Sequence, residues 1–508
     1  MVKTLKLSPF LKDLALTTAT SIATGLSLII VTRLLAQGFG PEGFGAYVLS
    51  RRILTIALPC STLAMGVTVA RYIAITEDAG SRFRFLLGGI ILGVAPSMGI
   101  FFIGIIFLDS LTTIVFHSVG YSSVWIATLF MVVGYSFYTA LYAFYRGSGQ
   151  MWKANLWQLV VMALGPIVIA GISARPSQVA WTLFLMGALA YTTTVPLGIY
   201  VSRGVSSYRQ NLNIISPLKE LFHYGLPRVP GGFALASILA TGPLLAPYFG
   251  SLQDAGYLIA GQAVFSLTEM MIMAFGLIVL PKAAQLFAEG KVEFLRERVG
   301  DILTLAIHLG LFAAIHFVLW TDQIILVWLG HQYLDAIPLM RILFLALIPY
   351  LAYIMLRSII DTVEEQAVNA RNLYVALIVA VTSSLVLAKI GLGVLGLAIG
   401  TTLGFVALGL STVRYLWRAN WIMAEGFCLK ECLWLNIGAF GIALGFKSLI
   451  VQSYAPVTVI GMALLMESIL FSLYCFMLRK LKIRWVIQLE QRVVGGESNE
   501  AVSKLGKD

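Results

Sequence analysis

The chain has 508 residues, of which 59% are hydrophobic and 12% are charged, and its formal net charge at pH 7 is +11. A soluble globular protein carries about 25% charged residues, so the composition excludes a mainly soluble protein. No gap between its apolar runs reaches the roughly 50 residues that a separate soluble domain needs.

Fourteen apolar stretches approach the roughly 20 residues that a helix needs to span a bilayer. We therefore predict an all-α polytopic membrane protein with about 14 transmembrane helices. The first stretch is longer than the ~7–15 residues of a signal-peptide core, which favours an uncleaved span. The predicted spans are residues 13–36, 45–70, 84–108, 121–145, 154–173, 179–201, 226–248, 255–280, 301–320, 336–357, 371–389, 393–414, 432–451 and 456–478.

The basic residues predict the orientation of these spans. With the N-terminus in the cytoplasm, 27 of the 35 Lys and Arg residues lie on that side, and the exterior loops hold only Arg175, Lys389 and Lys447. Such a bias is typical of the positive-inside rule. We predict a multi-pass protein of the bacterial inner membrane with both termini cytoplasmic. The net charge then reflects topology, and no nucleic-acid partner is expected.

Five arginines remain inside the predicted spans: Arg33, Arg51, Arg52, Arg228 and Arg341. An arginine at mid-span costs about 2.5–3.5 kcal/mol on insertion scales, so such residues usually face protein or water. Guanidinium groups in a water-filled cleft suit a diphosphate, and we predict these five as substrate-binding candidates. The alternatives are snorkelling to an interface, favoured for Arg228, and capping of helix carbonyls by one of the adjacent pair.

Other polar residues inside the spans have two interpretations each. Glu269 and Glu467 are the deep carboxylates, which could bind a coupling ion or pair structurally with an arginine. His308 and His316 lie on one face of a span, where packing is favoured over a proton relay.

Tyrosines form a stripe on the fourth predicted span. Tyr135, Tyr138 and Tyr142, with Tyr145, follow helical spacing. The first three are candidates for sugar contact, and packing or an aromatic belt is the favoured alternative.

Two short segments predict an internal repeat. Residues 39–47 read FGPEGFGAY, and residues 249–257, which lie 210 positions later, read FGSLQDAGY. Each copy lies between the first two spans of a six-span block, as in parallel-repeat transporters. We predict an N-terminal six-helix lobe (1–210), a C-terminal six-helix lobe (211–420), two additional transmembrane helices (421–480) and a cytoplasmic polar tail (481–508).

The sequence resembles one transporter family across most of its length. The similar segments are TRLLAQGFGPEGFGAYVLS, LYAFYRGSGQMWKANLWQL, LKELFHYGLPRVPGG, FGSLQDAGYLIA and GLGVLGLAIGTTLG. They resemble the polysaccharide-transporter branch of the multidrug/oligosaccharidyl-lipid/polysaccharide (MOP) exporter superfamily, the oligosaccharide or O-antigen repeat-unit flippases. The resemblance implies a MATE-like fold of two lobes with alternating access. It also implies translocation of an undecaprenyl-diphosphate-linked oligosaccharide, with membrane lipid and other polysaccharide-assembly proteins as partners.

Three rival functions stay open. A lipid II flippase shares the layout and also uses cavity arginines, whereas a multidrug cation exporter would need carboxylates in the cavity of the first lobe, and the predicted spans of that lobe contain no central Asp or Glu. A lipid-modifying membrane enzyme would need a large exterior loop. The sequence has no Walker A, HExxH or acidic-pair motif, and its four cysteines form no CxxC pair, so we expect no enzyme, cofactor or metal site.

Overall fold

The computed structural model describes residues 9–173, 175–208, 213–266, 268, 290, 292–363, 368–422 and 429–480. Within these residues every regular element is a helix, and no strand occurs. The predicted all-α class is confirmed. This outcome follows from the physics of the bilayer, where a helix satisfies all its backbone hydrogen bonds internally.

The first helix carries two of the predicted spans. α1 (Pro9–Ser61) is interrupted at Gly40, whose φ of 70° and ψ of 175° are not helical. Glycine adopts a positive φ without steric cost, and the proline that follows has no N–H to donate to the preceding turn. Predicted span one (13–36) therefore lies in the first arm of α1, and predicted span two (45–70) begins in the second arm and ends in α2 (Met65–Ile75).

The remaining helices follow in chain order. The first group comprises α2 (Met65–Ile75), α3 (Ala79–Ile106), α4 (Leu108–Phe116), α5 (Ser122–Gly147), α6 (Met151–Gln158), α7 (Gly165–Ile172), α8 (Val179–Tyr191) and α9 (Thr194–Tyr208). Next come α10 (Ile215–Gly225), α11 (Val229–Phe249) and a helix over residues 252–266. The last group comprises α13 (Val292–Trp328), α14 (Ile337–Leu345), α15 (Leu347–Val363), α16 (Val368–Leu387), α17 (Gly393–Arg418), α18 (Leu429–Ile450) and α19 (Pro456–Lys480).

The helices agree with the predicted spans where both can be compared. Among the described residues, ten helices are long and apolar enough to cross a membrane, or eleven if the bent pair α14–α15 forms one span. Val368–Arg418 contains two predicted spans separated by a glycine break, and Ala15–Ser61 contains most of predicted span one and the first part of predicted span two on either side of Gly40. Predicted span 255–280 begins in helix 252–266 and continues outside the described residues.

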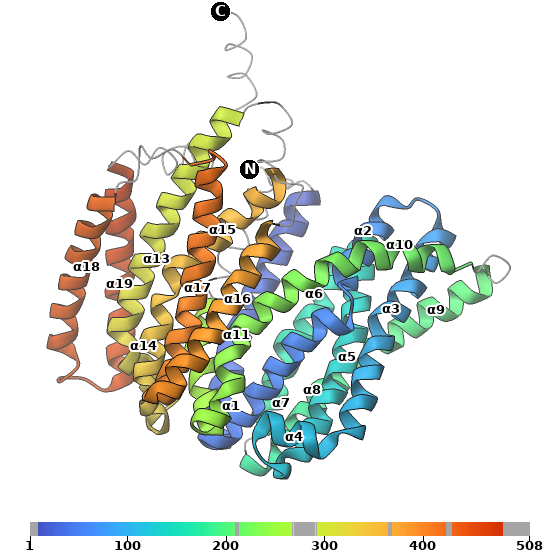
Figure 1. Ribbon diagram of the computed structural model, residues 1–508, viewed down its shortest axis with the longest axis horizontal. Helices are drawn as coiled ribbons and strands as arrows, with labels where there is room; N and C mark the ends of the chain where they lie inside the picture. The colour runs from blue at the N-terminus through green and yellow to red at the C-terminus, as the bar shows by residue number, and fades with distance from the viewer. Residues whose placement is uncertain are drawn as a thin grey trace, which may run out of the picture.

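The helices form two groups that lie side by side (Figure 1). α2 to α9 gather in one group and α13 to α19 in the other, with α1 and α11 between them. α18 and α19 lie at the outer edge and pack on α13. The predicted lobe boundaries at 210 and 420 stay predictions, although α10, near the first of them, connects one group to the other.

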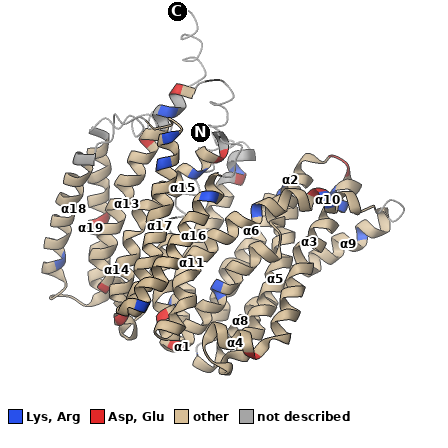
Figure 2. Cartoon of the chain, in the orientation of Figure 1, with Lys and Arg blue, Asp and Glu red and all other residues tan. Residues whose placement is uncertain are grey.

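Basic residues gather near one end of the molecule. Figure 2 shows Lys and Arg positions gathered mainly toward the end where α1 begins and α19 ends. We call this end the predicted cytoplasmic end, and the opposite one the predicted exterior end.

The two copies of the repeat pack against each other near the predicted exterior end. A side chain at Gly45 would overlap the backbone carbonyl oxygen of Leu252, and a Cβ atom at Gly256 would lie 3.4 Å from the Cα atom of Gly45. Glycine allows this close approach because it has no side chain. The repeated segments therefore bring the two groups of helices together.

Candidate functional site

The candidate site is a set of adjoining cavities around Arg51, which we call the central cavity. Three cavities of about 500, 400 and 410 Å³ share Arg51 as a lining residue. Their described linings include four arginines and no Asp or Glu: Arg51, Arg52, Arg228 and Arg357. Cavities of this size are typical of small-molecule sites, and this one carries a single sign of charge.

Arg51 is fixed in the cavity by α5. Its Nη1 donates a hydrogen bond to the hydroxyl oxygen of Tyr135 at 3.1 Å and lies 3.9 Å from the sulfur of Met131. Its Cζ lies 5.5 Å from the centre of the Tyr135 ring. None of these contacts is with a carboxylate, so the positive charge of Arg51 is oriented without being neutralised.

Arg52 contacts the helix over residues 252–266, which follows the second copy of the predicted repeat motif. Its Nη2 donates a hydrogen bond to Oε1 of Gln262 at 2.7 Å. Nε of Arg52 and Nε2 of Gln262 are buried and have no hydrogen-bond partner in the described part of the chain. An unsatisfied buried donor costs about 1–3 kcal/mol. Because Arg52 lines the cavity, its Nε is suited to bind an acceptor that enters it.

Arg228 and Arg357 place two more charges on the cavity wall. Arg228 lies at the start of α11, near the predicted cytoplasmic end, and shares one cavity with Arg51. Arg357 of α15 shares another cavity with Arg51. Sequence reasoning missed Arg357 because it was assigned to a cytoplasmic segment at the end of span ten. It also missed Gln262, although Gln262 lies 210 positions after Arg52, at the offset of the repeat.

Two of the five predicted arginines lie outside this lining. Arg33 is exposed, and its Nη1 donates to the backbone oxygen of Val327 in α13. Arg341 is exposed on α14 and is not among the described lining residues. The structure therefore brings together three of the five predicted arginines.

The tyrosine stripe divides by role. Tyr135 lines the cavity beside Arg51. Tyr138 is buried and stacks on Tyr142 with ring centres 5.7 Å apart, and the hydroxyl of Tyr142 donates to Oε1 of Gln158 at 3.0 Å. Gln158 itself lines the cavity. Of these three tyrosines, Tyr135 is the one in the described lining, with 1% of its side chain exposed, whereas Tyr138 and Tyr142 lie outside that lining.

The predicted exterior end is held closed by contacts from α1. Nε1 of Trp328 donates a hydrogen bond to the backbone oxygen of Ile29 at 3.0 Å. The hydroxyl of Tyr333 donates one to the backbone oxygen of Ala36 at 2.8 Å. The close approach of Gly45 to Leu252 lies at the same end. Since the lining also includes Arg228, the cavity reaches toward the predicted cytoplasmic end.

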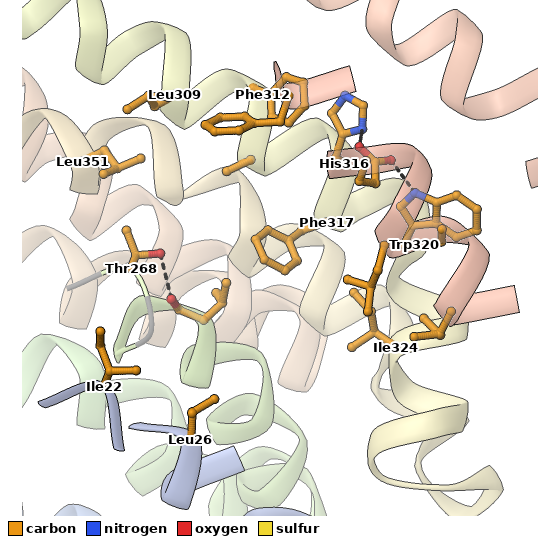
Figure 3. A pocket seen from close by; sticks show the side chains of 17 residues that line it. Ile22, Leu26, Thr268, Leu309, Phe312, His316, Phe317, Trp320, Ile324 and Leu351 are labelled. Atoms are coloured by element: carbon orange, nitrogen blue, oxygen red, sulfur yellow. Dashed lines mark hydrogen bonds and ion pairs between the residues drawn. The ribbon is translucent and has the colours of Figure 1, made fainter. Parts of the chain in front are cut away.

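A second, apolar cavity lies between α1, α13 and α19. Its volume is about 580 Å³, and its polar lining residues include His316, Trp320 and Glu467 (Figure 3). Oε2 of Glu467 lies 2.7 Å from Nδ1 of His316, and Oε1 accepts a hydrogen bond from Nε1 of Trp320 at 2.7 Å. His308 lies apart, with Nδ1 2.7 Å from the hydroxyl of Tyr474. Glu269, the other predicted coupling-ion residue, lies outside the described residues.

Comparisons with solved structures show which known proteins have a similar fold. No protein-family model and no curated protein matches this sequence. Among solved structures, the lipid II flippase MurJ in an inward closed conformation is similar with a TM-score of 0.70 at 11% identity, and the match covers 93% of this chain and 99% of that one. The chain has the fold of MOP-superfamily transporters.

Two further structures differ in conformation. A multidrug resistance MATE family transporter of the MOP superfamily in an inward-facing conformation has a TM-score of 0.64 at 15% identity, covering 78% of this chain and 94% of that one. A multidrug resistance MATE family transporter of the MOP superfamily in an outward-facing conformation has a TM-score of 0.55 at 16% identity, and the match covers 82% of this chain and 97% of that one.

Proposed function

We propose that this protein is a flippase that translocates an undecaprenyl-diphosphate-linked oligosaccharide across the bacterial inner membrane by alternating access, for surface polysaccharide biosynthesis. The observation that carries the proposal is the central cavity, with four arginines and no carboxylate in its described lining. A flippase moves its substrate without making or breaking a covalent bond, so the protein is not an enzyme in this account.

The charge of the cavity supports an anionic head group. Each charge-assisted hydrogen bond from a guanidinium to phosphate contributes about 1.5–3 kcal/mol, and two or more arginines can reach one diphosphate. Arg51 is oriented by Tyr135, and Arg52 has a buried Nε that lacks a partner in the described part of the chain. We therefore assign Arg51 and Arg52 to diphosphate binding; Arg228 and Arg357 line other parts of the same cavity.

Sugar contact is assigned to a smaller set than the sequence predicted. Tyr135 and Gln158 line the cavity and offer a ring face and an amide to sugar hydroxyls. Tyr138 and Tyr142 keep these groups in place by packing. Arg33 is assigned to the closure of the predicted exterior end, since it contacts α13 there.

Alternating access requires that closing contacts exist at one end and can be exchanged for others. The hydrogen bonds from Trp328 and Tyr333 to α1, with the glycine contact at Gly45, are the contacts that would break in the outward-facing state. Release of an anion to the exterior is favoured by an interior-negative potential, which supplies about 2.3 kcal/mol per charge per 100 mV.

Of the two predicted coupling-ion residues, Glu467 is the one that lies within the described part of the chain. An ionisable residue inside a span is a functional candidate by default, and the His316–Glu467 pair borders a cavity. Glu467 and His316 can each take up a proton, whereas the Trp320 N–H only donates, and neither His316 nor Trp320 offers the oxygen ligands that hard cations prefer. We therefore propose the proton as the ion that this pair binds.

Two rivals are weighed by specific observations. A lipid II flippase is the second candidate, because the MurJ structure matches this chain over 93% of its length. A multidrug cation exporter is disfavoured, because an arginine-lined cavity repels cations.

The test is a deletion strain of the organism that encodes the chain. We expect the lipid-linked saccharide to accumulate on the cytoplasmic face and surface polysaccharide to disappear. Wild type should restore export, and the variant Arg51→Gln/Arg52→Gln should not. Normal surface polysaccharide with increased sensitivity to cationic drugs would support the exporter, whereas lysis with lipid II retained inside would support the second candidate.

A further inference from the structure

Two arginines stack on one tyrosine at the cytoplasmic rim of the central cavity. Cζ of Arg228 lies 3.5 Å from the centre of the Tyr224 ring, and Cζ of Arg71 lies 4.5 Å from it. Nη1 of Arg71 donates to the Tyr224 hydroxyl oxygen at 2.6 Å, and Nη1 of Arg228 donates to the Tyr224 backbone oxygen at 2.6 Å. We call these three residues the rim cluster.

The two arginines of the rim cluster carry positive charge that no described carboxylate neutralises. Both arginines are exposed, and neither forms an ion pair within the described residues. Because the two Cζ atoms lie 3.5 and 4.5 Å from one ring centre, they are at most 8.0 Å apart. Two like charges this close repel each other, and an anion bridging them would remove that repulsion.

The cluster also lies on the route to the deeper arginines. Arg228 lines the same cavity as Arg51, whereas Arg71 comes from α2 and Tyr224 from the end of α10. The three residues therefore join the first group of helices to the start of α11, at the mouth of the cavity.

We propose that the rim cluster is a docking site for the diphosphate of the lipid-linked saccharide, which binds Arg71 and Arg228 before it passes to Arg51. This inference rests on the proposed function and adds a first binding step to it. Each guanidinium can donate two parallel hydrogen bonds to a phosphate. A diphosphate offers enough free oxygens to fill both forks, whereas a phosphodiester, as in a phospholipid head group, has two free oxygens and fills one.

The rim cluster could instead serve only to hold α10 against α2. Stacking of an arginine on an aromatic ring stabilises the contact between the two even at an exposed site. A purely structural role would change the melting temperature and leave anion binding unchanged, so binding and stability must be measured on the same variants.

The experiment uses the full chain in phosphatidylcholine nanodiscs with Arg51→Gln/Arg52→Gln as background, which removes the deep site. The probes are inorganic pyrophosphate and dimethyl phosphate, at matched ionic strength. We expect Arg71→Gln and Arg228→Gln each to weaken pyrophosphate binding about 5- to 10-fold, and the pair together more. Arg203→Gln, an exposed arginine of α9, is the matched control and should stay within twofold.

Tyr224→Phe separates ring from hydroxyl. It keeps the stacking surface and removes the acceptor of the Arg71 hydrogen bond, so we expect a loss smaller than that of Arg71→Gln. Arg71→Lys keeps the charge but loses the fork, and it should bind pyrophosphate less well than the background chain.

Three results would overturn the proposal. The first is pyrophosphate binding too weak to detect, and the second is equal pyrophosphate binding by all variants. The third is equally strong binding of the two probes, which would indicate a phospholipid head-group site. The proposed function is tested separately in the deletion strain. If Arg51→Gln/Arg52→Gln still abolishes export while the rim variants bind pyrophosphate normally, only the docking step is wrong.

Discussion

Arg52 and Gln262 form a hydrogen bond across the two halves of the molecule, with Nη2 and Oε1 2.7 Å apart. They are separated by 210 residues, which is also the offset between the two copies of the repeat. The predicted repeat makes these two positions equivalent, and equivalent positions of a two-fold repeat meet only near the axis that relates them. One copy carries a cation there and the other a neutral amide, so the pair keeps its positive charge.

Changing Gln262 tests whether that charge is needed. Gln262→Glu would place a carboxylate against Arg52 and neutralise it, while keeping the shape of the side chain. We expect export in the deletion strain to fall at least tenfold with the melting temperature unchanged or raised. Gln262→Asn, which stays neutral, is the control. Full export by Gln262→Glu would show that the charge of Arg52 is dispensable.

The hydroxyl of Tyr135 should matter more than that of its neighbour. Tyr135→Phe removes the acceptor of the Arg51 hydrogen bond, which contributes about 1.5–3 kcal/mol when a charged group is involved. Tyr138→Phe is the matched control, because the Tyr138 hydroxyl has no hydrogen bond to any described residue. We expect a several-fold loss of translocation for Tyr135→Phe only. Equal effects would mean that the tyrosines act through packing alone.

The glycine contact between the repeats should be sensitive to one added methyl group. Gly45→Ala would force the Cβ atom into the carbonyl oxygen of Leu252, and overpacking of this kind costs about 1–3 kcal/mol. Gly198→Ala is the control, since nothing lies within 4 Å of its Cβ position. Thermal unfolding of the purified proteins should separate the two variants by several degrees. A wild-type melting temperature for Gly45→Ala would contradict the packing.

Glu467 can be tested as a coupling residue apart from its structural role. Glu467→Gln keeps an oxygen that accepts from Trp320 but removes the charge beside His316. If the pair carries a proton, translocation should lose its response to an imposed pH gradient while the protein remains folded. The comparison is Lys447→Met, which breaks the 2.6 Å ion pair with Asp322 between α18 and α13. Lys447→Met should lower stability and leave the pH response intact.

Much of the fold could be predicted because the bilayer constrains it. Apolar length sets the spans, and the alternation of basic loops fixes their number. The break at Gly40 agrees with this picture, because the Gly-Pro pair ends one span and begins the next. Periodicity also placed the tyrosines on one face of α5.

The site could be predicted only in part, since a sequence does not say which helix faces meet. Arg33 and Arg51 lie in adjacent spans with similar surroundings in the sequence, yet Arg33 contacts α13 and Arg51 faces the cavity. Arg357 enters the lining from a helix end. The pairing of His316 with Glu467 joins spans nine and fourteen, and no local pattern links them.

The central claim is that the arginines of the cavity carry a diphosphate-linked saccharide across the membrane. The most direct measurement reconstitutes the purified chain in liposomes with a fluorescent polyprenyl-diphosphate saccharide and follows quenching by an impermeant reductant. We expect nearly complete quenching with wild type, against about half with empty liposomes or with Arg51→Gln/Arg52→Gln. Quenching that is equal for wild type and the double variant, at either level, would contradict the account.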